Sequence, residues 1–319
     1  FITSSMGLAL YPRDADNVID LLRNADAALY RAKRAGGNCF ELYSEEMGND
    51  AVDRLMLKSK LKRAFEREEL QLHYQLKYHL ETGRIAGAEG LVRWNLPERG
   101  LVYPSDFIPL AEESNLIQQL GNWVLNRACE DYRSWQRSLV APTKVSLNLS
   151  LKQLQQQRFL EELKSTLRAH GISPTSLELE ITETTLMVDA ERTIKLLNAL
   201  YGMGLHLTID DFGTGYSSLS ALQQFPITTL KIDQSFVRDV AIDKDDASIV
   251  TAIIQMGHSL NLEVVAEGVE SEAQLEFLRR EGCDYVQGHL FGDPITADVV
   301  LELLSEEANG ELHHRRLFA

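Results

Sequence analysis

Side chains bearing carboxylate, amide or amine groups recur where short apolar stretches of the sequence end. These residues are Glu89, Asn148, Glu180, Asp210, Asp211, Lys231, Glu267 and Gln287. Oxygen ligands of this kind favour Mg²⁺ or Mn²⁺ over zinc. The adjacent Asp210 and Asp211 would let one carboxylate bridge two ions, and such an ion pair can activate water against a phosphodiester. The pattern therefore predicts a site for metal-dependent hydrolysis.

Each of these residues, taken singly, is better explained as the solvated end of a strand. The whole series is harder to explain in that way, because charged side chains are rarely buried unless they are paired or bind metal. If the fold gathers the strand ends into one ring, the carboxylates must repel one another unless cations lie among them. We therefore expect bound divalent metal.

The elements that would position these residues are short strands that alternate with helical patterns. Candidate strands cover residues 70–77, 85–94, 144–149, 177–181, 205–209, 229–232, 263–266 and 285–287. Helical spacing of apolar residues lies between most of them, for example over residues 190–201 and 247–260. Such alternation favours a parallel sheet covered by helices. About eight strands over roughly 240 residues are typical of a TIM-type barrel, whose active site lies at the carboxyl ends of its strands.

One strand is expected to break the parallel order. Only the short turn at Glu81-Thr82-Gly83 separates the first two candidate strands of this region. A turn that short joins antiparallel strands, whereas parallel strands need a long crossover. The predicted fold is therefore an α/β, modified TIM-type (βα)8 barrel with one antiparallel strand.

The first 44 residues show a pattern that differs from that of the predicted barrel. We expect a strand over residues 1–10, a turn at Pro12, and a helix that stops at Gly36-Gly37. So short a segment cannot bury a core of its own, which suggests the end of a domain whose first part is absent. The predicted division is a front fragment at 1–44, a helical linker at 45–69, the barrel at 70–305 and a tail at 306–319.

Composition limits the partners and the compartment. The formal net charge is −15 and no basic patch stands out, which argues against binding to duplex nucleic acid. Cys39, Cys129 and Cys283 are far apart and form no CxxC pair, as expected for a reduced compartment. No run of about 18 apolar residues occurs, so this part of the protein should not contact a membrane. We expect it to be cytoplasmic, or the cytoplasmic part of a larger membrane-anchored protein.

The motifs of the second domain resemble those of the EAL family of cyclic di-GMP phosphodiesterases. The segments that carry the resemblance are residues 89–94, 148–150, 180–183, 210–219, 230–233, 266–270 and 287–288. They occur in order, each at a predicted strand end, from about residue 70 to about residue 294. The resemblance implies that a water activated by two Mg²⁺ or Mn²⁺ ions opens cyclic di-GMP to linear pGpG, in bacterial second-messenger signalling linked to biofilms.

Residue roles also follow from the resemblance. Six residues would bind the metal ions: Glu89, Asn148, Glu180, Asp210, Asp211 and Glu267. The expected catalytic residues are Lys231, Asp211 and Glu267. Lys231 would orient the attacking water, and Glu267 would be either general base or ligand. The expected substrate contacts are Gln75, Leu91, Arg93, Glu270 and Gln287. Glu183 would brace the loop that begins at Asp210; that loop and the following helix imply a homodimer. An ordinary turn capped by Ser217 explains the same loop residues equally well.

The front segment resembles the last part of a GGDEF domain, the module that synthesises cyclic di-GMP, through residues 6–12 and 25–33. Its nucleotide-binding half is absent, so this piece should have no cyclase activity. The barrel departs from the family pattern at Gly90, where alanine is usual, and at Leu76, where proline is usual. Neither change removes a ligand, although Leu76 makes the assignment of Gln75 to the guanine pocket less secure.

Two other functions remain open at this point. A module that binds cyclic di-GMP without cutting it would signal to a partner, but such members of the family have typically lost metal ligands, and none is missing here. An unrelated metal-dependent barrel enzyme is disfavoured by the ordered set of motifs. Failure to bind any cyclic dinucleotide would revive that third hypothesis.

Overall fold

The computed structural model describes residues 4–34, 38–186, 190–214 and 222–310. The chain divides into two compact units, Phe1–Glu69 with Ser105–Leu116, and Leu70–Pro104 with Ile117–Ala319. Gly36-Gly37, most of the loop that follows Asp211, and the last nine residues of the predicted tail lie outside the described residues. Among the described residues, no helix combines the length and apolar character that crossing a membrane requires.

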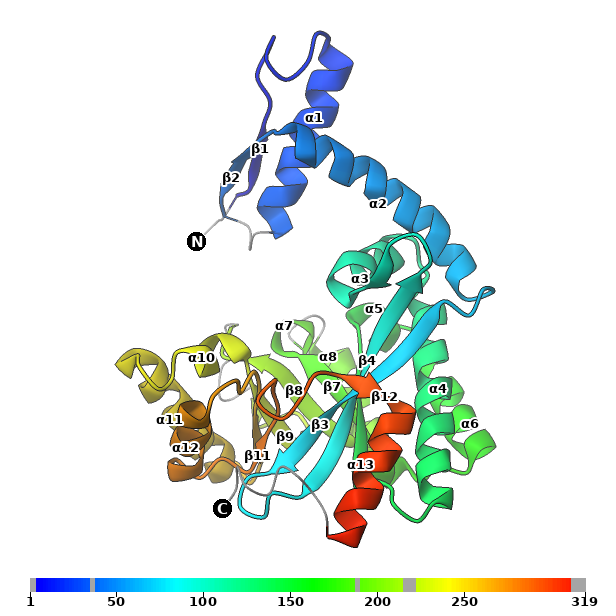
Figure 1. Ribbon diagram of the computed structural model, residues 1–319, viewed down its shortest axis with the longest axis vertical. Coiled ribbons are helices and arrows are strands. Elements are labelled where there is room, and N and C mark those ends of the chain that lie inside the picture. Colours follow the sequence, from blue (N-terminus) through cyan, green and yellow to red (C-terminus); the bar gives the residue numbers. More distant parts are fainter. Residues whose placement is uncertain (1–3, 35–37, 187–189, 215–221, 311–319) are drawn as a thin grey trace. The chain divides into compact units, whose positions relative to one another are not determined.

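The second unit is a closed barrel of eight strands (Figure 1). Hydrogen-bonded neighbours follow the order β3, β11, β10, β9, β8, β7, β6, β4 and return to β3. The strands are β3 (Leu70–His79), β4 (Ile85–Leu96), β6 (Lys144–Asn148), β7 (Leu177–Thr182), β8 (His206–Phe212), β9 (Thr229–Ile232), β10 (Glu263–Ala266) and β11 (Tyr285–Val286). The predicted barrel is thus confirmed, with strand limits that differ by a few residues.

The antiparallel strand is β3, as the short turn after it predicts. It pairs in antiparallel fashion with β4 on one side and β11 on the other, whereas the other neighbours in the ring are parallel. Two further strands were not predicted. β5 (Gly100–Val102) extends the sheet beside β4, and β12 (Ile295–Thr296) lies beside β3. Both are too short to show a hydrophobic period in the sequence.

Helices surround the barrel and cover its apolar outer face. They are α4 (Ile117–Arg137), α5 (Leu151–Leu154), α6 (Phe159–His170), α7 (Glu183–Leu186), α8 (Ala190–Tyr201), α10 (Gln234–Arg238), α11 (Lys244–Ser259), α12 (Glu272–Arg280) and α13 (Ala297–Asn309). Both α4 and α13 contact β3, and α11 contacts β10 (Figure 1). α13 continues beyond position 305, where the sequence suggested the start of a tail, and ends at Gly310 with a φ of 82°. Glycine suits that left-handed position because it has no Cβ.

Local signals fix several helix ends. Ser271 and Gln274 form a capping box at the start of α12, in which each side chain bonds the other residue's backbone N–H. The Asp243 carboxylate accepts hydrogen bonds from two backbone N–H groups of the first turn of α11. These caps satisfy donors that the helices leave free, and so they hold the connections between helix and strand in place.

The first unit contains β1 (Met6–Leu8), α1 (Val18–Arg34), β2 (Phe40–Leu42), α2 (Glu45–Ala64) and most of α3 (Pro104–Glu113). β1 is shorter than the predicted strand over residues 1–10 and pairs in parallel with β2, which was not predicted. Gly7 packs against α1 so closely that a Cβ would lie within about 2 Å of its backbone atoms. Met6, Leu8, Phe40 and Leu42 are exposed on the other face of these two strands.

Position 90 faces the helix layer, as the alternation of β4 predicts. Gly90 pairs with Tyr74, whose hydroxyl donates to Asp131 on α4 at 2.7 Å, whereas Glu89 points to the opposite side. An alanine Cβ at position 90 would lie 2.8 Å from Cδ2 of the buried Leu147. That methyl group can move, because it is the end of a side chain.

We therefore expect Gly90→Ala to change the free energy of unfolding by less than about 1 kcal/mol. The gain of about 0.5–1 kcal/mol from reduced backbone freedom is offset by the shift of Leu147. Affinity for Mn²⁺ should stay the same, because no ligand changes. Thermal unfolding and calorimetric Mn²⁺ titration measure the two quantities. A clear loss of Mn²⁺ affinity would show that this chain needs glycine at position 90 to keep its metal site intact.

Candidate active site

The strand register brings the predicted polar residues to one end of the barrel. Glu89 on β4 lies opposite Gln75 on β3, and Asn148 on β6 lies opposite Glu180 on β7. Asp210 on β8 pairs with Thr182, so it lies at the last residue of β7. Because the parallel strands all end at this rim, their terminal side chains converge, as the sequence predicts.

Lys231 stands at the centre of this group and is 1% exposed. Its Nζ lies 2.6 Å from Glu180 Oε2 and 3.3 Å from both Glu89 Oε2 and Asp210 Oδ1. It also forms an ion pair with Glu267. One ammonium group therefore faces four carboxylates, which together with Asp211 we call the acidic cluster.

An irregularity in β8 places the two adjacent aspartates side by side. Consecutive side chains of a regular strand point to opposite faces. Here the register shifts between Ile209 and Phe212, and Asp211 has a left-handed φ of 53°. Aspartate tolerates that conformation better than most residues do. As a result, carboxylate oxygens of Asp210, Asp211 and Glu267 all lie within 4.8 Å of one another.

The pKa values show how poorly these charges are balanced. Burial and the neighbouring charge of Asp210 raise the pKa of Asp211 to about 6. Burial, together with the charges of Asp210 and Glu89, raises the pKa of Glu267 to about 8 despite the nearby Lys231. Glu89 differs: burial would raise its pKa, but Lys231, Lys77 and a hydrogen bond from Gln287 hold it below the usual value. A group that resists ionisation beside other carboxylates is stabilised as an anion when a cation binds.

Amide groups complete the wall of the cluster. Asn148 Nδ2 donates to Glu89 Oε1 at 2.7 Å, and Gln287 Nε2 donates to Glu89 Oε2 at 2.8 Å and to Gln75 Oε1 at 2.9 Å. The other amide atom, Gln287 Oε1, is buried without a hydrogen-bond partner among the described residues. A buried acceptor of this kind normally binds water or an ion. With the carboxylate oxygens, it makes a donor set that fits Mg²⁺ or Mn²⁺.

The other expected site residues lie around this core. Arg93 is 7% exposed on β4, two residues beyond Leu91, and its guanidinium carbon lies 5.3 Å from the centre of the Tyr103 ring. Glu270 lies farther out, where its exposed carboxylate is 3.5 Å from His289 Nδ1. Glu183 Oε2 accepts a hydrogen bond of 3.2 Å from the backbone N–H of Gly213. That bond ties the start of the loop after Asp211 to the end of β7.

Two charged residues that touch this group were not singled out in the sequence. Lys77 Nζ donates to Glu180 Oε1 at 2.7 Å and to Glu178 Oε1 at 2.9 Å, and all three side chains are buried. Lys77 shares the phase of Gln75 in the alternating strand β3, and that phase is the signal that could have found it. Glu178 lies two residues before Glu180 on the same strand and therefore shares its inward face.

Comparison with known proteins places these features in a family. The model of the EAL domain family matches residues 58–294. The "Bifunctional diguanylate cyclase/cyclic di-GMP phosphodiesterase MucR" of Pseudomonas aeruginosa is 44% identical over 300 residues, which are 94% of this chain and 44% of that protein. The "Cyclic di-GMP phosphodiesterase NbdA" of the same organism is 41% identical over 303 residues, which are 95% of this chain and 39% of that protein.

A solved structure described as "PaMucR Phosphodiesterase, c-di-GMP complex" superposes with a TM-score of 0.75 and is 45% identical, covering 77% of this chain and all but 1% of that one. The chain spans less than half the length of the two curated relatives described above. The match to the EAL domain model covers most of the chain and every residue of the acidic cluster. The chain therefore belongs to the EAL domain family.

Proposed function

We propose that the barrel is a cyclic di-GMP phosphodiesterase that opens its substrate to linear pGpG at a site for two divalent cations. The observation that carries this proposal is the acidic cluster itself: no expected metal-binding side chain is missing, and its five carboxylates are in contact with only two lysines among the described residues, Lys231 and Lys77. The names of MucR and NbdA, and the dinucleotide in the related crystal structure, indicate the substrate.

The chain's own residues would share the work as follows. Glu89, Asn148, Glu180, Asp210, Asp211 and Glu267 would hold the ions. Bound Mg²⁺ or Mn²⁺ supplies a nucleophilic water at neutral pH and neutralises the phosphate. Lys231 would orient that water, and Glu267, which forms an ion pair with Lys231, would accept a proton from it.

Substrate contacts are proposed on the rim. Arg93 offers a guanidinium fork suited to phosphate. The other proposed contacts are Leu91 on β4, Gln75 on β3 and Gln287 just after β11. Gln75 already bonds Gln287, so it would have to exchange that bond for one to the ligand. Glu270 would close the outer edge, and Glu183 would hold the backbone at Gly213, where the loop after Asp211 begins.

We also propose the wider setting that the resemblance implies. The first 44 residues would be the end of a GGDEF domain, residues 45–69 a helical linker, residues 70–305 the catalytic barrel and residues 306–319 a tail. The protein would act as a homodimer in bacterial signalling, in the cytoplasm. Light scattering with and without cyclic di-GMP tests the dimer directly.

Product analysis tests the activity. We expect purified protein to convert cyclic di-GMP to pGpG when Mg²⁺ or Mn²⁺ is present, and the Glu89→Ala variant to yield no product. Glu89 contacts Lys231, Asn148 and Gln287, so its loss removes a ligand and disorganises the two amides that hold it. Chromatographic separation of substrate and product gives both rates. Intact substrate after prolonged incubation, with tight binding by calorimetry, would make the protein a receptor instead.

A further inference from the structure

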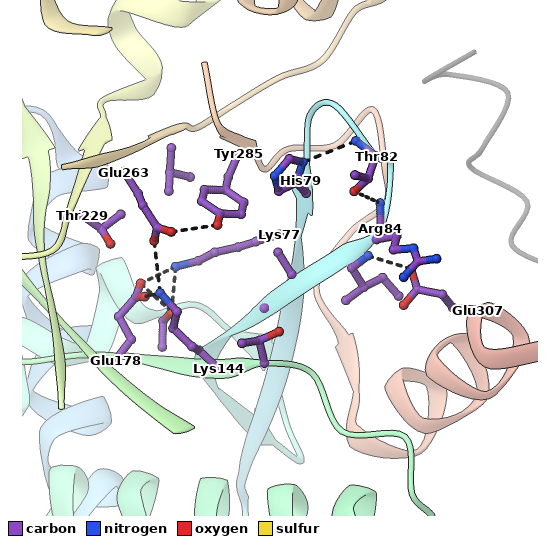
Figure 2. A pocket seen from close by; sticks show the side chains of 16 residues that line it. Lys77, His79, Thr82, Arg84, Lys144, Glu178, Thr229, Glu263, Tyr285 and Glu307 are labelled. Carbon is purple, nitrogen blue, oxygen red and sulfur yellow. Dashed lines mark hydrogen bonds and ion pairs between the residues drawn. The ribbon is translucent and has the colours of Figure 1, made fainter. Parts of the chain in front are cut away.

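Lys77 lies at the end of the barrel opposite the rim. It lines a cavity of about 390 Å³ together with the first residues of several parallel strands, among them Lys144 and Glu263 (Figure 2). Because β3 is antiparallel, its later residues reach this end while its earlier residues reach the rim. Lys77 therefore approaches the acidic cluster from below, from the side that the proposed substrate does not reach.

The contacts of Lys77 are complete and specific. Its Nζ makes three hydrogen bonds, to Ser146 Oγ at 2.7 Å, Glu178 Oε1 at 2.9 Å and Glu180 Oε1 at 2.7 Å. An ammonium group has three protons, so all are used. The second oxygen of Glu180 accepts from Lys231 at 2.6 Å. Each carboxylate oxygen of Glu180 thus accepts a hydrogen bond from a different lysine.

This division of Glu180 has a chemical consequence. We propose that Lys77 is a positioning residue that holds Glu180 by Oε1, so that only Oε2 is presented to a cation in the acidic cluster. Without Lys77, Glu180 could turn both oxygens toward Lys231 and form a two-point ion pair with it. An incoming cation would then have to break a stronger contact. The inference rests on the proposed metal site but not on the identity of the substrate.

The anchor of Lys77 is itself fixed. Glu178 accepts hydrogen bonds from Ser146 Oγ at 3.0 Å and Lys77, and its other oxygen lies 3.6 Å from Lys144 Nζ. Lys144 in turn lies 3.2 Å from Glu263, which accepts from the Tyr285 hydroxyl at 3.0 Å (Figure 2). The positive charges of the two lysines are therefore paired with the negative charges of Glu178 and Glu263. Their arrangement supports a structural anchor rather than a second ligand site.

A charge-balanced pair of substitutions tests the role. Lys77→Met with Glu178→Gln removes one positive and one negative charge, so the total charge near Glu180 is unchanged and only its anchor is lost. Residues that orient metal ligands typically contribute about 10–100-fold to metal affinity or activity. We expect Mn²⁺ affinity, measured by isothermal titration calorimetry, to fall by that factor, and kcat for cyclic di-GMP to fall with it.

The matched control is Lys144→Met with Glu263→Gln, which removes the neighbouring pair at the same end. That pair contacts no member of the acidic cluster, so Mn²⁺ affinity should stay close to the parent value. A lower Tm in the Lys77 double variant with parental Mn²⁺ affinity would overturn the proposal and leave Lys77 a purely structural residue. Lys77→Gln, which keeps a donor, should recover part of the affinity; no recovery would equally contradict a hydrogen-bonded anchor.

The Mn²⁺ titration separates this proposal from the proposed function. If the parent binds Mn²⁺ but does not hydrolyse cyclic di-GMP, the phosphodiesterase assignment fails while the anchor is still tested by affinity. If the parent does not bind Mn²⁺, both fail. If the parent hydrolyses the substrate and the double variant matches it in Mn²⁺ affinity and kcat, only the anchor fails.

Discussion

Replacing Asp211 with asparagine is expected to abolish measurable hydrolysis while making the metal-free protein more stable. The carboxylates of Asp210 and Asp211 lie side by side, and with Glu267 they form the group of oxygens within 4.8 Å of one another. Asparagine keeps the shape of the side chain and removes one of the repelling charges. The same change removes a carboxylate that would help to hold the metal ions. Because metal ions supply several kcal/mol of transition-state stabilisation, the rate should fall by roughly a thousandfold.

Rate and stability should therefore move in opposite directions, as is common when a functional site is removed. Product chromatography and thermal unfolding in the presence of a chelator measure the two effects. Asp239→Asn is a suitable control, because Asp239 pairs with Arg238 at the surface and touches no residue of the acidic cluster. A drop in Tm of the Asp211→Asn protein would argue that Asp211 supports the fold, contrary to the proposal.

Replacing Lys231 with methionine should produce the largest loss of stability in the metal-free protein. The ammonium group contacts four buried or nearly buried carboxylates, and removing it leaves them with Lys77 as the remaining contacting lysine. Breaking a buried ion pair from one side typically costs about 3–5 kcal/mol. Divalent cations should restore most of this loss, because they replace the missing positive charge. Hydrolysis should not return, since the proposed contact to the attacking water is gone.

Chemical denaturation with and without Mn²⁺ measures the recovery. Lys144→Met gives the comparison, because Lys144 forms partly exposed ion pairs with Glu178 and Glu263 at the other end of the barrel, away from the cluster. Mn²⁺ should stabilise the Lys144→Met variant only as much as it stabilises the parent protein. Equal Mn²⁺ effects on the two variants would mean that the cation does not enter the cluster around Lys231.

The sequence predicts the barrel well because its strands are apolar and flanked by helical periods. It also predicts that β3 and β4 form an antiparallel hairpin, since so short a turn cannot join parallel strands; the strand pairing then shows that β3 is the reversed strand. The end of strand β8 is less well predicted, because the expected strand stops at Ile209 and the observed strand continues to Phe212. The extra residues are Asp210, Asp211 and Phe212. In the sequence, two adjacent aspartates suggest the start of a loop. In the structure, Asp210 and Phe212 still pair with the neighbouring strands β7 and β9.

The members of the acidic cluster could be predicted because each lies within or at the end of a largely apolar strand. Their mutual arrangement could not, since it depends on the left-handed φ of Asp211 and on the register shift in β8. The contact of Lys77 with this cluster could not be predicted for another reason. Lys77 falls in the polar phase of an alternating strand, where a solvent-facing lysine is the ordinary expectation. Its partners on β6 and β7 are more than 60 residues away in sequence. The roles of the rim residues stay predictions.

The reversed direction of β3 has a mechanical consequence. Leu70, the first residue of the strand, pairs with Trp94 near the carboxyl end of β4, so the peptide chain enters the barrel at its catalytic rim. A parallel first strand would put that entry point at the far end. Tension or torque applied through the upstream backbone is therefore delivered within five residues of Gln75, which bonds Gln287 beside the acidic cluster. Because β3 is reversed, a force on the chain before Leu70 acts on the same end of the barrel as the acidic cluster.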